Sequence, residues 1–249
     1  MPRSGVYASY RKDLPEGQRL RDLEQTVGDL GAALKVGPGG KLKVNPSAAD
    51  KLSFCSSATY LLFCDVVAEL QREGIVPSDR QLSRELADVG EREKVIAGKM
   101  DGVGIFGHWN ADGPGTAMLF HRLGLGRNLY GLEHARPGDF LKIFWNENIG
   151  KGEKGHLVVF LGMNSAGNAV QVWSSNLKNS DGSSGYGTMW VEKERIKRAV
   201  LSRLEHPENL HRWLKFSNSE KTSDYLVRIR QTGSTGEEMK RAVGAIDFP

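Results

Sequence analysis

The sequence predicts an α+β fold, with helices in its first half and an antiparallel sheet in its second half. Between residues 15 and 123 several segments have helical patterns, and over residues 20–34 the apolar residues recur at spacings of three and four, the period of a helix buried along one side. From residue 138 the apolar period changes to two, which is typical of strands. Turn-rich loops join consecutive strands, so we expect an antiparallel meander.

The composition favours one globular domain with elaborations. The chain has 249 residues, of which 39% are hydrophobic. No apolar run approaches the roughly 20 residues of a membrane span, and Met1–Ser4 lacks the apolar core of a secretory signal. The formal charge of +4 favours acidic partners, but acidic and basic residues are interleaved except around Lys193–Arg203. We therefore expect a soluble chain with no membrane span and no nucleic-acid function.

The first 50 residues are predicted to form a helical extension. Residues 1–14 are polar, and an apolar stripe then begins after Pro15, formed by Leu20, Leu23, Val27, Leu30 and Leu34. The segment Val36–Gly40 contains glycine and proline and should end this helix. Residues 41–50 should be irregular or briefly extended before the main domain, which we place over residues 51–213.

A cysteine opens the next helix, which is predicted over Cys55–Glu73 and ends at Gly74. A helix begins with N–H groups that lack intrahelical partners and with the positive end of the dipole, so a thiolate can persist there at neutral pH. On position alone, a small buried hydrophobe is the competing interpretation of this cysteine. Cys64 falls among the apolar positions of the same helix and is expected to belong to the core.

Three further helical segments should precede the sheet. Ser78 can cap a helix over residues 79–89, residues 91–100 form a short helical piece, and a third helix ends at residue 123. The two cysteines are nine residues apart along one helix, which is too far for a disulfide. The six histidines are scattered and no Cys-x-x-Cys is present, so we expect neither a metal nor another cofactor.

The segment 102–115 is dense in glycine and aromatic residues. Its glycine spacing resembles a dinucleotide fingerprint, but no strand precedes it and we reject that match. We expect a loop at the border of a cleft, with Trp109 and Asn110 as substrate contacts.

Strands are predicted over residues 138–145, 155–162, 168–176, 188–191 and 199–204. A polar loop over residues 178–187, a short helix near residues 192–196 and one or two helical turns over residues 207–213 complete the domain. The remainder, residues 214–249, is charged and mostly polar. We expect a partly mobile tail, with a strand at Tyr225–Ile229.

Three motifs follow one another along the chain: Phe54-Cys55-Ser56-Ser57, Arg136-Pro137-Gly138-Asp139-Phe140, and the strand from Gly155-His156 to Gly162. Together and in this order they resemble the NlpC-type cell-wall peptidases and related papain-like amidases. The pattern of that family is Asp-Cys-Ser-Gly, then Pro-Gly-Asp, then a Gly-His strand that closes on glycine, so the chain departs from it at Phe54 and Ser57. The resemblance covers about residues 50–205 and implies a papain-like fold, in which the nucleophile helix packs on an antiparallel sheet.

The resemblance implies a catalytic cysteine and histidine, Cys55 and His156. An amide carbonyl needs a strong nucleophile, a base that can protonate the leaving amine, and donors for the oxyanion, which the Cys55 N–H and a neighbour would supply. A third polar group should orient the imidazole from the paired strand. An even hairpin loop, such as residues 164–167, sets His156 opposite Ser175, whereas an odd loop brings Ser174 or Asn176 to its face. Asn176 is the chemically preferred orienter, with Ser175 second.

The favoured function is a cysteine amidohydrolase that cleaves an amide in a peptidoglycan stem peptide or cross-link through a thioacyl intermediate. Acyl or amide transfer on the same thiol is one alternative. A non-catalytic wall-binding module with a vestigial cleft is another, supported by the departures at Phe54 and Ser57. A cell-wall or other peptide substrate of this kind would place the protein in the periplasm or outside the cell.

Overall fold

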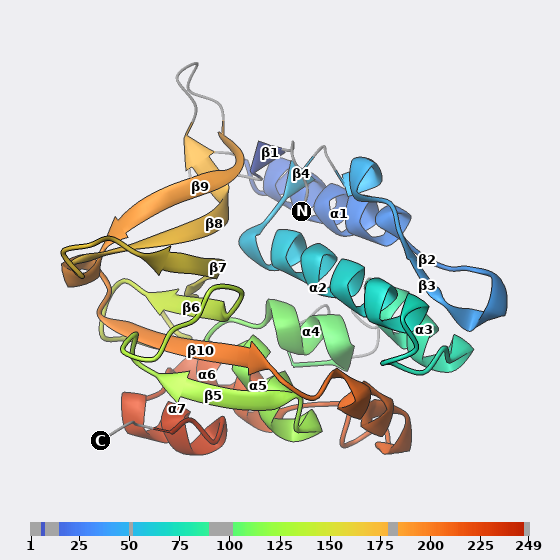
Figure 1. The fold of residues 1–249 in the computed structure, drawn as a ribbon. Coiled ribbons are helices and arrows are strands. Elements are labelled where there is room, and N and C mark those ends of the chain that lie inside the picture. Colours follow the sequence, from blue (N-terminus) through green and yellow to red (C-terminus); the bar gives the residue numbers. More distant parts are fainter. Residues whose placement is uncertain (1–5, 8–14, 50–51, 90–101, 179–183, 247–249) are drawn as a thin grey trace.

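The structure is a computed structural model that describes residues 6–7, 15–49, 52–89, 102–178 and 184–246. Within these ranges it confirms a mixed helical and antiparallel architecture, with a curved sheet flanked by helices (Figure 1). The helices are α1 (Glu16–Ala33), α2 (Cys55–Arg72), α3 (Arg80–Ala87), α4 (Gly104–Asn110), α5 (Gly115–Leu123), α6 (Asp224–Thr232) and α7 (Gly236–Ala242). Short 3₁₀ helices are η1 (Pro38–Gly40), η2 (Pro46–Ala49), η4 (Lys193–Arg195) and η5 (Pro207–Lys215).

The main sheet has six strands in the order β5-β10-β6-β7-β8-β9. Its strands are β5 (Gly126–Tyr130), β6 (Phe140–Phe144), β7 (His156–Met163), β8 (Ala169–Lys178), β9 (Ser184–Glu192) and β10 (Arg198–Leu204). Strands β6 to β9 form the predicted meander, whereas β10 returns to lie between β5 and β6. Two small sheets pair β1 (Val6–Tyr7) with β4 (Leu52–Ser53) and β2 (Leu34–Val36) with β3 (Leu42–Val44). The sequence did not predict β5 or the β2–β3 hairpin.

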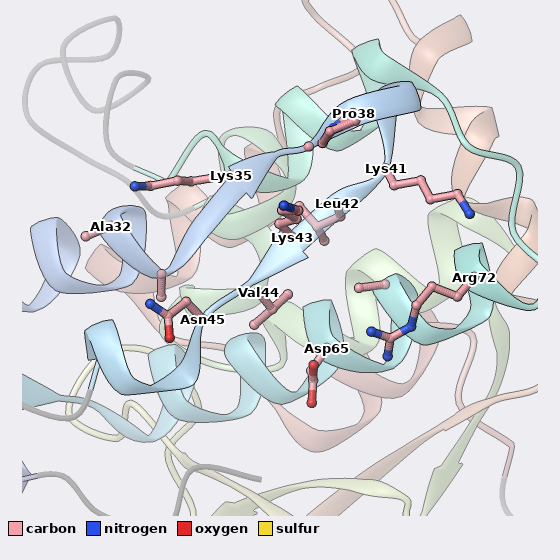
Figure 2. A pocket seen from close by; sticks show the side chains of 13 residues that line it. Ala32, Lys35, Pro38, Lys41, Leu42, Lys43, Val44, Asn45, Asp65 and Arg72 are labelled. Atoms are coloured by element: carbon pink, nitrogen blue, oxygen red, sulfur yellow. The ribbon is translucent and has the colours of Figure 1, made fainter.

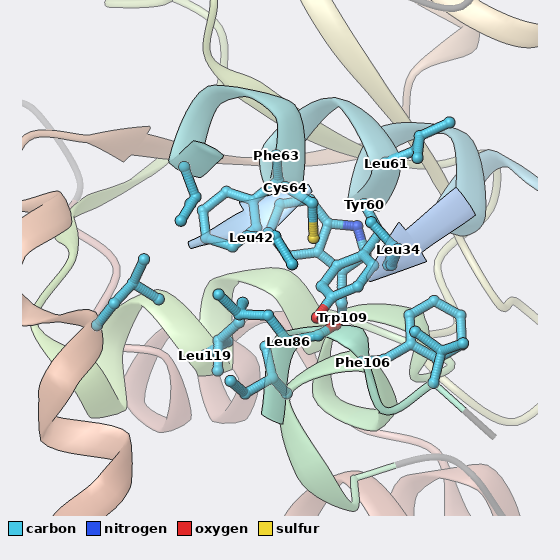
Figure 3. Packing of buried hydrophobic residues seen from close by; sticks show 14 of the residues in the cluster. Leu34, Leu42, Tyr60, Leu61, Phe63, Cys64, Leu86, Phe106, Trp109 and Leu119 are labelled. Carbon is cyan, nitrogen blue, oxygen red and sulfur yellow. Dashed lines mark hydrogen bonds between the residues drawn. The ribbon is translucent and has the colours of Figure 1, made fainter. Parts of the chain in front are cut away.

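Helix α2 packs across one face of the sheet and forms the largest core with it. Tyr60 and Phe63 of α2 lie in the same buried cluster as Phe140, Leu157 and Trp173 of the sheet. Figure 3 shows another part of the same cluster, in which Cys64 of α2 lies among Leu42, Tyr60 and Trp109. Because α2 packs on β7 and β8 of the sheet and also contacts α1, α4 and β3, it is apolar on more than one face.

The other face of the sheet is buried against the sheet itself. Its cluster contains Leu141, Val158, Val172 and Leu201, and every member of it comes from a strand or from a loop that joins strands. The sheet therefore curls around this cluster, as its strong curvature in Figure 1 shows.

The C-terminal segment is part of the core, which corrects the expectation of a partly mobile tail. Residues Tyr225–Ile229 lie in helix α6, not in a strand, because Ser223 caps that helix by accepting a hydrogen bond from the Leu226 N–H (3.3 Å). Leu226, Ile229 and Met239 are fully buried in a third cluster with Phe144 and Val200 of the sheet. Helices α6 and α7 thus cover the β10 side of the sheet.

The glycine-rich segment is also helical, and not the predicted loop. Its residues Gly104–Asn110 form α4, whereas α5 over Gly115–Leu123 is the helix that the sequence predicts to end at residue 123. A Cβ at Gly115 would sit 2.0 Å from the His108 carbonyl oxygen, so glycine there permits the two helices to approach closely. The helix predicted over residues 91–100 and residues 179–183 of the predicted polar loop fall outside the described ranges, and residues 184–187 of that loop belong to β9 instead. No helix within those ranges is long and apolar enough to cross a membrane.

Candidate active site

Cys55 is the first residue of α2, as the sequence predicts. The Phe54 backbone is extended (φ −105°, ψ 169°) and its N–H donates to Ser57 Oγ (2.7 Å), which fixes the first turn. Ser53 Oγ lies 3.1 Å from the same Ser57 hydroxyl. One of the two departures from the family pattern, Ser57, is therefore a residue that caps the helix at the cysteine.

The Cys55 sulfur lies at the start of β7. The pairing of β7 with β8 ends at Val159 and Trp173. Beyond this pair, towards the start of β7, the Leu157 N–H donates to the Cys55 sulfur instead of to β8. His156, the residue before it, forms a side-chain hydrogen bond with the same sulfur. The thiol and the imidazole predicted to act together are thus brought into contact, at the point where two strands separate.

The charges around Cys55 make its thiol acidic. Burial alone would raise the pKa, but the positive charge and hydrogen bond of His156, the charge of Lys142 and the Leu157 N–H together lower it to about 6. Cys64 gives the opposite case, because burial raises its pKa far above the ordinary value. It lies fully buried beside Tyr60 and Phe63 (Figure 3). Only one of the two thiols is therefore suited to act as a nucleophile at neutral pH.

His156 is held by three neighbours. It pairs with Ile143 across β6 and β7, and its ring stacks on Trp145, with centroids 6.4 Å apart. Its Nε2 lies 2.9 Å from Ser174 Oγ. Since Nε2 is engaged by this hydroxyl, Nδ1 is the ring nitrogen left to face the thiol. In a thiolate–imidazolium pair Nε2–H donates to Ser174 Oγ, so the serine orients the ring.

The residue that contacts the His156 imidazole in the structure is not one of the two that the sequence favoured for orienting it. Asn176 was the preferred residue, and its side chain is outside the described part of the structure. Ser175, the second choice, does not contact His156: its Oγ is buried and has no hydrogen-bond partner among the described residues. The hydroxyl at the imidazole is that of Ser174, which the sequence considered only for an odd hairpin loop.

A β-bulge explains the position of Ser174. Met163 pairs with Val170, so the loop is even, but the register shifts between Phe160 and Gly162. Without that shift, Ser175 would lie on the face of His156; with it, Ser174 does. One additional residue in β7 therefore places Ser174, and not Ser175, on the same face of the sheet as His156.

The two predicted substrate contacts have different positions. Trp109 is completely buried, stacks on Phe63 (4.8 Å between centroids) and donates from Nε1 to Thr59 Oγ1 (3.1 Å), so it is a core residue (Figure 3). Asn110, at the end of α4, is half-buried and accepts a hydrogen bond at Oδ1 from Ser56 Oγ. It lies next to the residue that follows Cys55, which leaves its amide N–H groups as possible donors at the site.

Two charged residues of the predicted motifs have roles that sequence reasoning did not assign. Asp139 accepts from the Arg136 N–H (2.8 Å) and pairs with Arg203 (2.7 Å), so it fixes the start of β6. Lys142 lies in the middle of β6 and is only 5% exposed, yet its charge acts on Cys55. A single lysine inside the apolar run Phe140–Trp145 was a signal that the sequence contained.

A pocket elsewhere in the structure is separate from the Cys55 thiol. This pocket, of about 450 Å³, lies between the β2–β3 hairpin and the outer side of α2 (Figure 2). Its lining includes Lys35, Lys41, Lys43, Asp65 and Arg72, and none of Cys55, His156 or Ser174. It therefore gives no information about the chemistry at Cys55.

Comparisons of the chain with protein families, with curated sequences and with solved structures return no match.

Proposed function

We propose that this chain is a cysteine amidohydrolase in which Cys55 is the nucleophile and His156 the general acid and base. The observation that carries the proposal is the contact of the Cys55 sulfur with His156, together with the hydrogen bond from the far side of that imidazole to Ser174. A thiolate, a base that can return a proton and a group that orients the base are the parts that acyl transfer to a cysteine requires.

The reaction would proceed in two steps. The Cys55 thiolate attacks the amide carbonyl, and the imidazolium of His156 gives its proton to the departing amine, which leaves a thioester on Cys55. His156, now neutral, then takes a proton from water, whose oxygen attacks the thioester and releases a carboxylic acid. The free N–H groups of the first turn of α2 and the Asn110 amide are the proposed donors to the oxyanion in both steps.

The proposed substrate is an amide bond in a peptidoglycan stem peptide or cross-link. This choice is supported by the three motifs that resemble cell-wall peptidases, and by the agreement between their order and a helix that packs on an antiparallel sheet. A papain-like fold of the NlpC type is part of the same proposal. The protein would then act in the periplasm or outside the cell.

A digest of purified peptidoglycan tests the proposal. The wild-type protein should release fragments with a new amino terminus and a new carboxylate, detected by mass spectrometry, and Cys55→Ala should release none while it keeps its circular dichroism spectrum. Cys64→Ala is the matched control and should keep releasing them. Fragment release by Cys55→Ala at the wild-type rate would refute the proposal.

A further inference from the structure

A buried lysine lies within the candidate site and takes no part in the two reaction steps proposed above. Lys142 is the central residue of β6, a strand in which all five residues are buried. A lysine is almost never buried to this degree unless its ammonium has favourable partners. One of its contacts is a hydrogen bond from Nζ to the Ala111 carbonyl oxygen, at 3.5 Å.

The backbone places this lysine beside the reactive thiol. Lys142 pairs directly with Leu157 across β6 and β7. The N–H of Leu157 donates a hydrogen bond to the Cys55 sulfur. The next pair along the same two strands is Ile143 and His156. Lys142 and His156 are thus neighbours of the same sulfur, from adjacent strands.

Gly155 makes room for the lysine side chain. A Cβ at Gly155 would lie 2.5 Å from Lys142 Cε and 2.9 Å from Phe144 Cε1, and the backbone there has a φ of +75°. Glycine before His156 therefore serves a steric purpose, since it lets the lysine stem cross the start of β7.

We propose that Lys142 is a positioning residue whose buried ammonium stabilises the Cys55 thiolate independently of His156. The inference deepens the proposed function and rests on it for its biological meaning. A charge held in a buried strand acts through a low local dielectric and is little screened by salt, so it acts on the sulfur more strongly than a surface lysine would.

The other charged groups near the site are engaged elsewhere. Glu153, two residues before Gly155, accepts at Oε2 from the Trp145 N–H (2.9 Å) and at Oε1 from the Gly155 N–H (3.0 Å). His108 of α4 bonds to the Gly104 carbonyl (2.8 Å) and to Arg122 (2.9 Å). The charges that act on Cys55 are those of His156 and Lys142, and both lower the pKa that burial would otherwise raise.

With two positive charges, His156 and Lys142, the Cys55 thiolate should depend less on the histidine than the thiolate of a simple cysteine–histidine pair does. In such a pair the thiolate depends on the imidazolium, so removal of the histidine returns the thiol to ordinary acidity. With Lys142 present, the thiolate should survive the loss of His156 in part. The two contributions can be measured by a double-mutant cycle, because either charge can be removed without the other.

The test is the rate of iodoacetamide alkylation of Cys55 against pH, read from the Cys55 peptide by mass spectrometry. Lys142→Met is neutral and of similar length. Lys142→Gln is also neutral but retains a donor for the Ala111 carbonyl, so one variant can still be measured if the other does not fold. Each should move the alkylation midpoint up by about one pH unit. His156→Gln should also raise the midpoint, and the Lys142→Gln, His156→Gln double variant should raise it further than either single change.

Lys154→Met is the matched control. Lys154 precedes Gly155 but has a side chain that is 64% exposed and lies 3.8 Å from Asp112, so its removal should leave the midpoint at the wild-type value. A midpoint in folded Lys142→Met and Lys142→Gln equal to that of the wild type would overturn the proposal. The measurement needs no substrate, so failure to digest peptidoglycan would refute the proposed function and leave this inference to be decided by the titration alone.

Discussion

Ser174 Oγ lies 2.9 Å from His156 Nε2, and it reaches that nitrogen because a bulge in β7 shifts the register by one residue. The serine hydroxyl therefore occupies the place where the sequence favoured an asparagine. A hydroxyl can accept from Nε2–H without adding a charge, which is the requirement for orienting an imidazole that alternates between its neutral and protonated forms.

Ser174→Ala should lower the rate of amide cleavage by about 10- to 100-fold, because a hydrogen bond to a charged imidazolium is worth about 1.5–3 kcal/mol. The rate should be measured under single-turnover conditions with the peptidoglycan fragment that the digest identifies. Ser175→Ala is the matched control, since the Ser175 hydroxyl is buried without a described partner. It should leave the rate unchanged, and an equal loss in both variants would contradict the assignment of Ser174.

Ionisation of Cys55 should make stability depend on pH. The pKa in the folded protein is about 6, against an ordinary value of 9.0, so the folded state binds fewer protons between these values. The free energy of unfolding gained by ionisation is complete above pH 9 and is lost as the pH falls through 6. Urea unfolding of wild type and Cys55→Ala should therefore show a stability difference that grows in favour of the wild type from pH 6 to pH 9. A difference independent of pH would contradict the acidic thiol.

His108 should give a separate pH dependence on the acid side. Burial lowers the pKa of His108 from 6.5 to about 4; the hydrogen bond to the Gly104 carbonyl opposes this shift and the positive charge of Arg122 adds to it. A lowered histidine pKa means that stability is complete above pH 6.5 and falls as the pH drops towards 4, by on the order of 3 kcal/mol. His108→Gln should show a shallower decline between these values in urea titrations. A decline as steep as that of the wild type would place its origin elsewhere.

The C-terminal helices should contribute to global stability. Ile229→Ala removes a fully buried side chain of α6 and should lower the free energy of unfolding by about 2–5 kcal/mol. Ile75→Ala truncates the same residue type at a position that is 49% exposed, and should change stability by less than about 1 kcal/mol. Similar small effects from both changes, measured by denaturant unfolding, would show that α6 does not pack as described.

The parts that the sequence predicted are those determined by local pattern. The bounds of α1, α2 and α5, the strands β6, β7 and β8, and the start of α2 at Cys55 all follow from apolar period, glycine stops and turn residues. The contact of Cys55 with His156 was anticipated only through the resemblance to a known motif order, because a hundred residues separate the two and no local rule joins them.

The parts that it missed depend on tertiary context. The identity of the residue at His156 Nε2 depends on one bulge at Leu161, which no spacing rule predicts. The glycines around α4 indicated a loop, yet Gly115 serves close helix packing and Trp109 became core. Tyr225–Ile229 is too short for apolar period to distinguish strand from helix, and the Ser223 cap was the overlooked signal.

The central claim is that Cys55, and not Cys64, is a thiolate near neutral pH. Its most direct test is iodoacetamide labelling of the wild-type protein across pH 4 to 10 in the absence of substrate, with the two cysteine peptides quantified separately. Labelling of Cys55 should have a midpoint near pH 6, and labelling of the buried Cys64 should be negligible in the folded protein. A Cys55 midpoint near the ordinary value of 9.0, or equally slow labelling of both thiols, would contradict an acidic Cys55.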